Sequence, residues 1–265
     1  MIGANIYSTV FHKMESDFTV LFSDIGDRSL QAQTPAEIDI WLLDLHNIQP
    51  EKIPRLEKYL SADELARAKK IRHELDFVST RAFVRLCIAQ YLNTSPSELL
   101  FENAPAGKPY LSNSPLPFYF NLSHCENMVA LGISKHTNIG VDIEKLKMRS
   151  FMDIAERYFN LDEFKQLQAC DPAKQKLLFF TLWTLKEAFF KALGSGIVTG
   201  LDKVCFDLAS EKITYKFAPE LKLIESEWQF YHTSPAQDVH FSVACSSAAP
   251  LSLRWFNGAE LFNHS

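Results

Sequence analysis

Residues 177–193 read LLFFTLWTLKEAFFKAL, the clearest structural signal in the chain. The pattern predicts one long helix that begins after Pro172 and ends at Gly194, because glycine favours the left-handed conformation at a helix C-terminus. Nearly every side of this helix is apolar, so we expect the rest of the chain to bury it.

Three charged side chains interrupt the middle of that helix: Lys186, Glu187 and Lys191. Charged groups are rarely buried without partners. Glu187 and Lys191 lie four residues apart in the order that favours an ion pair along a helix, which is the simplest interpretation. We favour a charged wall of a cleft, because a surface ion pair is less natural on a helix that is otherwise buried.

Shorter helices and strands surround this helix without a regular βαβ order. Ser61 and Glu64 have the spacing of a capping box at the start of a helix, and a second helical run ends near Asn93. Mixed elements of this kind predict an α+β fold. The expected strands are 38–45, 118–122, 128–133, 139–144 and 239–245.

The composition argues against two classes of protein. The 265 residues include 27 Lys and Arg against 32 Asp and Glu, and the net charge of −5 argues against a basic footprint for nucleic acid over the whole chain. No run approaches the ~18 apolar residues of a membrane span, and no signal peptide is recognisable. The five cysteines are scattered without a C-x-x-C pair, which favours a reduced, cytoplasmic protein.

The segment GVDIE (140–144) predicts a strand with two acidic side chains. Because side chains alternate across a strand, Asp142 and Glu144 share one face. Neighbouring carboxylates repel each other unless a cation lies between them, and Mg²⁺ binds one or two carboxylates together with phosphate oxygens. A solvated strand end is the simpler alternative for this pair taken alone.

Two other segments carry groups that suit phosphate. The alternating strand FNLSH (120–124) ends in Ser123 and His124. These sequence neighbours do not form a nucleophile–base pair, and the chain lacks a G-x-S-x-G elbow. The loop GKP (107–109) offers backbone N–H groups and one ammonium, without the spacing of a P-loop.

A basic run lies between Glu64 and Arg85, where six cations accompany three acids. A solvated helix face is the default interpretation, and phosphate binding by arginine is the alternative. The six cations are Arg67, Lys69, Lys70, Arg72, Arg81 and Arg85.

Together these segments resemble the signature of the 4'-phosphopantetheinyl transferases, in the larger surfactin-synthetase type. The pair GVDIE (140–144) and WTLKEAFFK (183–191) carries the resemblance. The segments 103–109 and 120–124 resemble two further motifs of the family in the same order. Four ordered motifs argue against chance similarity.

The resemblance implies an enzyme that transfers the 4'-phosphopantetheine arm of coenzyme A to a serine of an apo acyl or peptidyl carrier protein and releases 3',5'-ADP. It implies Mg²⁺ held by Asp142, Glu144 and Glu187. It also implies a catalytic set of Glu187 as the base, Lys191 at the leaving phosphate, and Asp142. The implied coenzyme A contacts are Arg67, Lys70, Arg81, Gly107, Lys108, Pro109, Ser123, His124, Lys186 and Lys191.

The resemblance further implies two similar α/β-sandwich halves related by a pseudo-two-fold axis, with the active site at their junction. We expect these halves to span 1–138 and 139–265, in a monomer. Carriers of the fatty acid, polyketide, peptide synthetase and aminoadipate reductase pathways all stay open as partners. Two alternative functions also stay open: a Mg²⁺-dependent pyrophosphate hydrolase acting on coenzyme A or nucleotides, and a non-catalytic module that binds carrier proteins.

Overall fold

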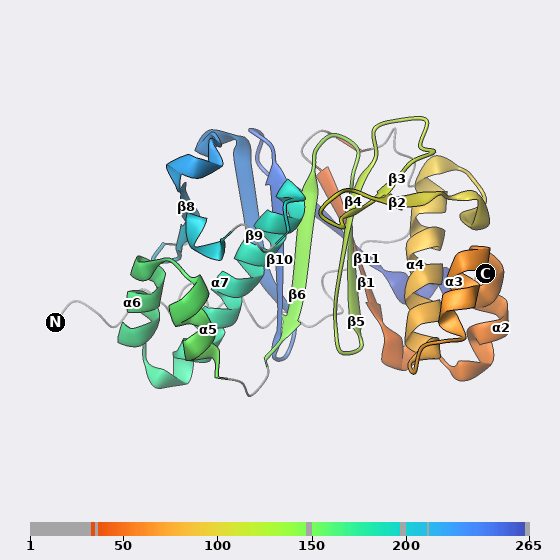
Figure 1. Ribbon diagram of the computed structural model, residues 1–265, viewed down its shortest axis with the longest axis horizontal. Coiled ribbons are helices and arrows are strands. Elements are labelled where there is room, and N and C mark those ends of the chain that lie inside the picture. Colours follow the sequence, from red (N-terminus) through yellow and green to blue (C-terminus); the bar gives the residue numbers. More distant parts are fainter. Residues whose placement is uncertain (1–32, 35–36, 147–149, 197–199, 211, 263–265) are drawn as a thin grey trace.

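The computed structural model describes residues 33–34, 37–146, 150–196, 200–210 and 212–262. Residues 1–32, part of the first expected half, lie outside them. The α-helices are α2 (Ile53–Leu56), α3 (Ala62–Ala68), α4 (Glu74–Leu92), α5 (Phe151–Tyr158), α6 (Leu161–Ala169) and α7 (Pro172–Leu193). The strands are β1 (Glu37–Asp44), β2 (Phe101–Asn103), β3 (Pro109–Leu111), β4 (Tyr119–Cys125), β5 (Met128–Ser134), β6 (Ile139–Lys145), β7 (Val204–Asp207), β8 (Thr214–Phe217), β9 (Trp228–Ala236), β10 (Val239–Ser246) and β11 (Ser252–Asn257). Two main sheets lie side by side, with α5–α7 on one flank and α2–α4 on the other (Figure 1).

Helix α7 confirms the predicted long helix. The Asp171 side chain accepts a hydrogen bond from the N–H of Ala173 (3.0 Å) at its start, and Gly194, with φ of +70°, ends it. The helix packs on β6 and β10. Gly140 of β6 permits this close approach, because a Cβ at that position would lie 1.9 Å from the carbonyl oxygen of Ala188. A larger residue there would push α7 away from the strand.

The sheet under α7 is antiparallel, in the order β6-β10-β9. Aromatic side chains fill the core between this sheet, α7 and the small β7–β8 sheet. Phe189 of α7 stacks on Phe217 of β8, with ring centroids 5.0 Å apart, and meets Trp228 of β9 edge-on at 4.9 Å. This aromatic packing accounts for the apolar character of α7 on nearly every side.

The other main sheet has the order β11-β1-β5-β4. Helix α4 shares its hydrophobic core, in which Trp41, Phe83 and Phe256 are fully buried. Strand β11 lies parallel to β1, and the guanidinium of Arg254 donates two hydrogen bonds (2.6 and 2.9 Å) to the carboxylate of Asp39. The last strand of the described chain therefore completes the sheet that contains the first.

The two sheets meet at the edges of β4 and β6, where side chains rather than a backbone ladder make the described hydrogen bonds. The N–H of Val141 donates to Oδ1 of Asn121 (2.8 Å), and the N–H of Ile143 donates to Oγ of Ser123 (3.3 Å). Below this seam, apolar side chains of both sheets form one shared core cluster. The seam therefore places polar side chains of β4 directly against β6.

The structure confirms the mixed α+β class and the five strands expected from the sequence; β4 continues to Cys125. The capping box of Ser61 and Glu64 is also present, at the start of α3. The pseudo-two-fold symmetry and the division at 138/139 stay predictions, and β11 lies in the sheet of the first expected half. Within the described ranges, no helix is both long and apolar enough to cross a membrane.

Candidate functional site

Strand β6 carries the two carboxylates that the sequence singles out. Asp142 is almost fully buried, with 3% of its surface exposed, and Glu144 is partly exposed. Val141 and Ile143, which alternate with them, are buried in the core that the sheets share. The alternation predicted for this strand is therefore present, with the acidic face turned toward α7.

Helix α7 brings a third carboxylate and a cation to the same place. Glu187 lies on the turn that covers Gly140 and is 5% exposed. Lys191, one turn later, donates from Nζ to Oδ1 of Asp142 (2.6 Å) and to Oγ of Ser123 (2.9 Å). Lys191 thus ties the helix to both β6 and β4.

The charges around Glu187 perturb its acidity. Burial, together with the negative charges of Asp142 and Glu144, raises the pKa of Glu187 to about 7 against the opposing effect of Lys191. A carboxyl group with such a pKa exchanges a proton near neutral pH, which is the property that general acid–base chemistry requires. Perturbed groups of this kind cluster at functional sites.

Asp142 has one oxygen in use and one without a partner. Ser123 Oγ donates to Oδ1 (2.9 Å), where Lys191 also binds. Its Oδ2 is buried and accepts no hydrogen bond from any described residue. Because buried carboxylate oxygens are normally satisfied, Oδ2 marks a position that suits a cation.

These carboxylates supply oxygen ligands, which are the type that a hard divalent cation prefers. Carboxylate oxygens suit Mg²⁺, which completes its octahedral shell with water and substrate phosphate oxygens. The described residues contain no ready-made group of three or more His, Cys, Asp or Glu side chains placed to hold a metal. Mg²⁺ does not require such a group, because one or two carboxylates with phosphate oxygens and water satisfy it.

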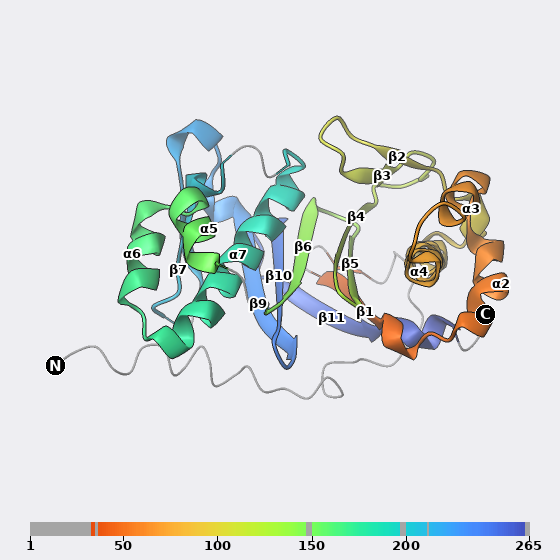
Figure 2. The ribbon, with the colours of Figure 1, turned by 60° about the horizontal axis from the view of Figure 1, so that its bottom comes forward.

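A pocket of about 250 Å³ opens beside this cluster, between the β2–β3 loop, β4 and the end of α7. Lys108 from that loop donates from Nζ to the carbonyl oxygens of Ile139 (3.0 Å) and Ala192 (3.3 Å), and burial lowers its pKa to about 8. Figure 2 shows the β2–β3 hairpin above β4, with its loop extending toward α7. The lining residues are Ala106, Gly107, Lys108, Pro109, Asn121, Leu122, Glu187, Phe190, Lys191, Gly194 and Gly196.

The structure therefore brings together most of the residues predicted for the site. Asp142, Lys191 and Ser123 contact one another, Glu187 is within electrostatic reach of Asp142 and Lys191, and the 107–109 loop lies beside them. His124 is exposed on β4, directly after Ser123. Asn121, which the sequence interpretation did not assign, lines the pocket; its place two residues before Ser123 on an alternating strand is the signal for it.

Lys186 does not lie with this cluster. Its side chain is fully buried and pairs with Glu163 of α6 (2.7 Å), and its Nζ also donates to the carbonyl oxygens of Leu201 (2.9 Å) and Val204. These contacts occupy the three donors of the ammonium group. The structure thus gives Lys186 a role in holding α6, α7 and β7 together.

The basic residues of the first half also lie apart from the carboxylates. Arg81 donates to Glu64 (2.6 Å), and Arg67 lies over the ring of Phe77 at 5.4 Å. Arg67 and Lys70 are exposed. Figures 1 and 2 place α3, which carries Arg67, on the far side of α4 from β4.

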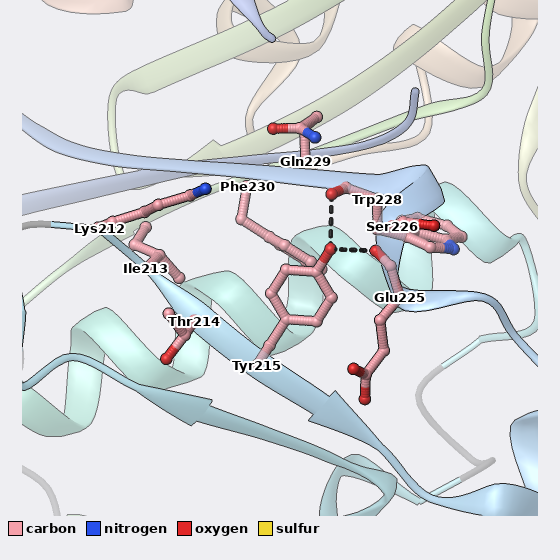
Figure 3. A pocket seen from close by; sticks show the side chains of 9 residues that line it. All are labelled: Lys212, Ile213, Thr214, Tyr215, Glu225, Ser226, Trp228, Gln229 and Phe230. Carbon is pink, nitrogen blue, oxygen red and sulfur yellow. Dashed lines mark hydrogen bonds between the residues drawn. The ribbon is translucent and has the colours of Figure 1, made fainter. Parts of the chain in front are cut away.

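A second, larger pocket of about 430 Å³ lies between β8 and β9. Figure 3 shows Tyr215 spanning it, with the hydroxyl directed at the carbonyl oxygens of Glu225 and Trp228 (2.6 Å to Trp228). Its lining holds one acidic and one basic side chain, Glu225 and Lys212, and none of the predicted site residues. Size alone therefore does not identify the candidate site.

Comparison with known proteins gives consistent results. The family model of the 4'-phosphopantetheinyl transferase superfamily matches residues 138–244. The 4'-phosphopantetheinyl transferase HetI of Nostoc sp. is 32% identical over 197 residues, covering 71% of this chain and 82% of HetI. The 4'-phosphopantetheinyl transferase psf-1 of Bacillus pumilus is 32% identical over 164 residues, which cover 61% of this chain and 69% of psf-1. The human L-aminoadipate-semialdehyde dehydrogenase-phosphopantetheinyl transferase is 29% identical over 230 residues, which cover 79% of this chain and 70% of the human protein.

Proposed function

The chain belongs to the 4'-phosphopantetheinyl transferase superfamily and is a 4'-phosphopantetheinyl transferase, and we propose that it moves the arm of coenzyme A to a serine of an apo acyl or peptidyl carrier protein. The serine oxygen attacks the phosphorus that bears pantetheine, the bond from that phosphorus to the bridging oxygen breaks, and 3',5'-ADP leaves. One observation carries the proposal: Lys191 joins Asp142 and Ser123 beside Glu187, at the rim of a pocket.

Glu187 is the proposed base. The serine hydroxyl must lose a proton as it attacks, and a carboxylate with a pKa of about 7 accepts that proton near neutral pH. Its burial keeps bulk water from competing for the same oxygen. Lys191 faces the developing negative charge of the leaving phosphate, and its bond to Asp142 fixes where its ammonium lies.

The group that completes the site is Mg²⁺, which Asp142, Glu144 and Glu187 would hold together with the phosphates of coenzyme A. When bound, it would neutralise the negative charge of the phosphate oxygens, which is the main requirement of phosphoryl-type transfer. The buried, unpartnered Oδ2 of Asp142 supports this assignment. Asp142 thereby serves both Lys191 and the cation.

Coenzyme A contacts are proposed for the residues next to this cluster. Gly107, Lys108 and Pro109 line the pocket, and Ser123 and His124 lie on the adjacent strand. Arg67 and Lys70 are exposed and stay proposed contacts for the distant 3'-phosphate. Lys186 and Arg81 are engaged with Glu163 and Glu64, so we no longer propose them for coenzyme A.

The same proposal covers the location of the active site, the oligomeric state and the cellular compartment. We place the active site at the junction of two similar halves, in a monomer, because the β4–β6 seam brings residues of both main sheets to the pocket. All five cysteines are free thiols, which fits a reducing compartment such as the cytoplasm. The identity of the carrier decides the pathway served.

Intact-mass spectrometry tests the proposal. Purified apo carrier protein is incubated with coenzyme A, Mg²⁺ and this protein, and we expect a mass gain equal to the phosphopantetheine arm. Chelation with EDTA and the variant Glu187→Gln each abolish the gain, while circular dichroism of the variant stays that of the parent. Breakdown of coenzyme A without carrier modification would instead indicate a hydrolase. Carrier binding with neither reaction would indicate a binding module.

A further inference from the structure

A row of polar side chains crosses the sheet beneath α7. Ser242 of β10 lies opposite Asp142 of β6 on one side and opposite His232 of β9 on the other. Directly opposite residues of an antiparallel sheet project on the same face, so all three face α7. The remainder of the layer between this helix and the sheet is mostly apolar, which sets this row apart.

Helix α7 meets the row with two threonines. Thr184 Oγ1 lies 2.8 Å from Oγ of Ser242, and both residues are fully buried. His232 Nδ1 lies 3.0 Å from Ser242 Oγ, and His232 Nε2 lies 3.4 Å from Nδ1 of His240. Thr181 Oγ1 lies 3.3 Å from Nε2 of His232 and 3.4 Å from Nδ1 of His240.

A single assignment of protons satisfies every donor in this chain of contacts. His240 donates to His232, His232 donates to Ser242, Ser242 donates to Thr184, and Thr184 donates to the backbone carbonyl of Phe180 (2.9 Å). Burial lowers the pKa of both histidines, so both imidazoles are neutral, as this assignment requires. The chain therefore links β9 and β10 to the backbone of α7 without a buried charge.

The link lies one turn before Glu187. Residues three apart share a helix face, so Thr184 and Glu187 both face the sheet. On the other side of Glu187, Gly140 lets Ala188 and Ala192 touch the backbone of β6. Glu187 therefore sits between two fixed points, a hydrogen bond at Thr184 and a close backbone contact at Ala188.

We propose that Thr184 and Ser242 are positioning residues, whose mutual hydrogen bond sets the distance between Glu187 on α7 and the carboxylates of β6, and thereby the affinity of the site for a divalent cation. This inference rests on the proposed function for its metal site. It assigns roles to two fully buried residues outside the proposed coenzyme A contacts. Partners that orient metal ligands typically change metal affinity by about 10- to 100-fold when they are removed.

Two substitutions at one position separate geometry from stability. Thr184→Val keeps the shape of the side chain and removes the hydroxyl, whereas Thr184→Ser keeps the hydroxyl and removes a methyl group. Binding of Mn²⁺ to the full-length protein, with coenzyme A present, is followed by electron paramagnetic resonance. We expect Thr184→Val and Ser242→Ala to weaken Mn²⁺ binding about tenfold, and Thr184→Ser to bind like the parent protein.

The matched control is Ser234→Ala, which removes another buried serine hydroxyl from β9 of the same sheet; it should leave Mn²⁺ binding unchanged. The double variant Thr184→Val with Ser242→Ala should be about as weak as either single variant, because both remove the same hydrogen bond. Parental affinity in Thr184→Val, equal weakening in Ser234→Ala, or additive losses in the double variant would each overturn the inference.

Carrier modification by the parent protein, measured in parallel by intact mass, separates the two proposals. If the parent modifies the carrier and the Thr184→Val variant binds Mn²⁺ normally, the positioning role fails while the transferase function stands. If Mn²⁺ binding weakens as expected but the parent modifies no carrier, the positioning role stands while the proposed substrate chemistry fails.

Discussion

Asp142 is held through one of its two oxygens. Oδ1 receives Lys191 and Ser123, while Oδ2 stays buried without a partner among the described residues. One oxygen, Oδ1, therefore binds the ammonium of Lys191, and the other, Oδ2, is left for the cation that we propose binds together with substrate. Burial, and after it the charges of Asp142 and Lys191, set the pKa of Glu187.

The neighbours of Glu187 are expected to shift its pKa in opposite directions. In the metal-free protein, Lys191→Met removes a positive charge that lowers the pKa, so the midpoint of Glu187 should rise above about 7. Asp142→Asn removes a negative charge that raises the pKa, so the midpoint should fall. Titration of the Glu187 carboxyl by ¹³C nuclear magnetic resonance measures both. Shifts of the same sign would contradict this account of the cluster.

Among the elements, α7 is the one on which the site depends, and it is fixed to its surroundings by three different kinds of contact. It packs closely on the backbone of β6 at Gly140 and forms a hydrogen bond to β10 through Thr184. It also forms an ion pair with Glu163 of α6 through Lys186. The phenyl rings of Phe159 and Phe206 also flank the ammonium of Lys186. The helix is therefore held by β6 and β10 on its sheet side and by α6 on its opposite side.

Breaking the ion pair of Lys186 and Glu163 should affect folding rather than transfer. Removing one partner of a buried ion pair costs about 3–5 kcal/mol, because the other charge is left buried alone. We expect Lys186→Met to lower the free energy of unfolding by that amount in urea titrations, with unchanged kcat and KM per folded molecule. Combining it with Glu163→Leu should restore much of the loss. A raised KM for coenzyme A in Lys186→Met would return this lysine to the binding site.

The histidine pair under α7, in which His240 is buried and His232 partly buried, should make the fold sensitive to acid. Burial lowers the pKa of His240 from 6.5 to about 3, so between these values the unfolded chain binds more protons than the folded one. Stability is therefore intact above about pH 6.5 and falls as the pH drops below it, by up to about 1.4 kcal/mol per pH unit for each such group. His240→Gln should flatten this decline in urea titrations between pH 7 and pH 5. A decline as steep as that of the parent would assign the acid sensitivity to other groups.

On the scale of the whole molecule, the chain closes on itself. Strand β11 pairs with β1 across more than two hundred residues of sequence, and Arg254 neutralises Asp39, which has no exposed surface. The first sheet thus depends on the last described strand. A division of the chain into two separate halves would leave one sheet with a missing edge.

A chain that stops at Pro250 should therefore lose cooperative folding of the first sheet. Its β1 edge would be open, and Asp39 would be buried without its cation. We expect hydrogen exchange of β1 and β5 amides to become fast. A peptide covering 251–262, added in trans, should restore protection. Parental exchange rates in the shortened chain would show that β11 is dispensable.

The sequence predicts local and periodic features of this molecule well. The alternation at 140–144, the long helix after Pro172 and the capping box at Ser61 are all set by neighbouring residues, and all are present. The cluster of Asp142 with Lys191 depends on a contact between residues 49 positions apart. Only the order of the family motifs, and not the spacing within any one segment, indicated that these residues meet.

Two residues predicted to contact coenzyme A have partners inside the protein, for a common physical reason. Lys186 and Lys191 lie on one helix, and sequence alone does not distinguish an ammonium that finds a buried carboxylate from one that faces a pocket. The partner of Lys186, Glu163, lies on a different helix and carries no signal of its own. Likewise Arg81 is occupied by Glu64, the residue that closes the capping box of α3.

The pairing of β11 with β1 also sets the time at which the enzyme can begin to work. A nascent chain leaves the ribosome from its N-terminus, at about 5–20 residues per second. Strand β1 emerges early and waits until residue 257 has been translated before its parallel neighbour can bind. The sheet that supplies β4 to the pocket is completed only then. A chain that has not yet been translated as far as β11 is therefore expected to lack carrier-modifying activity.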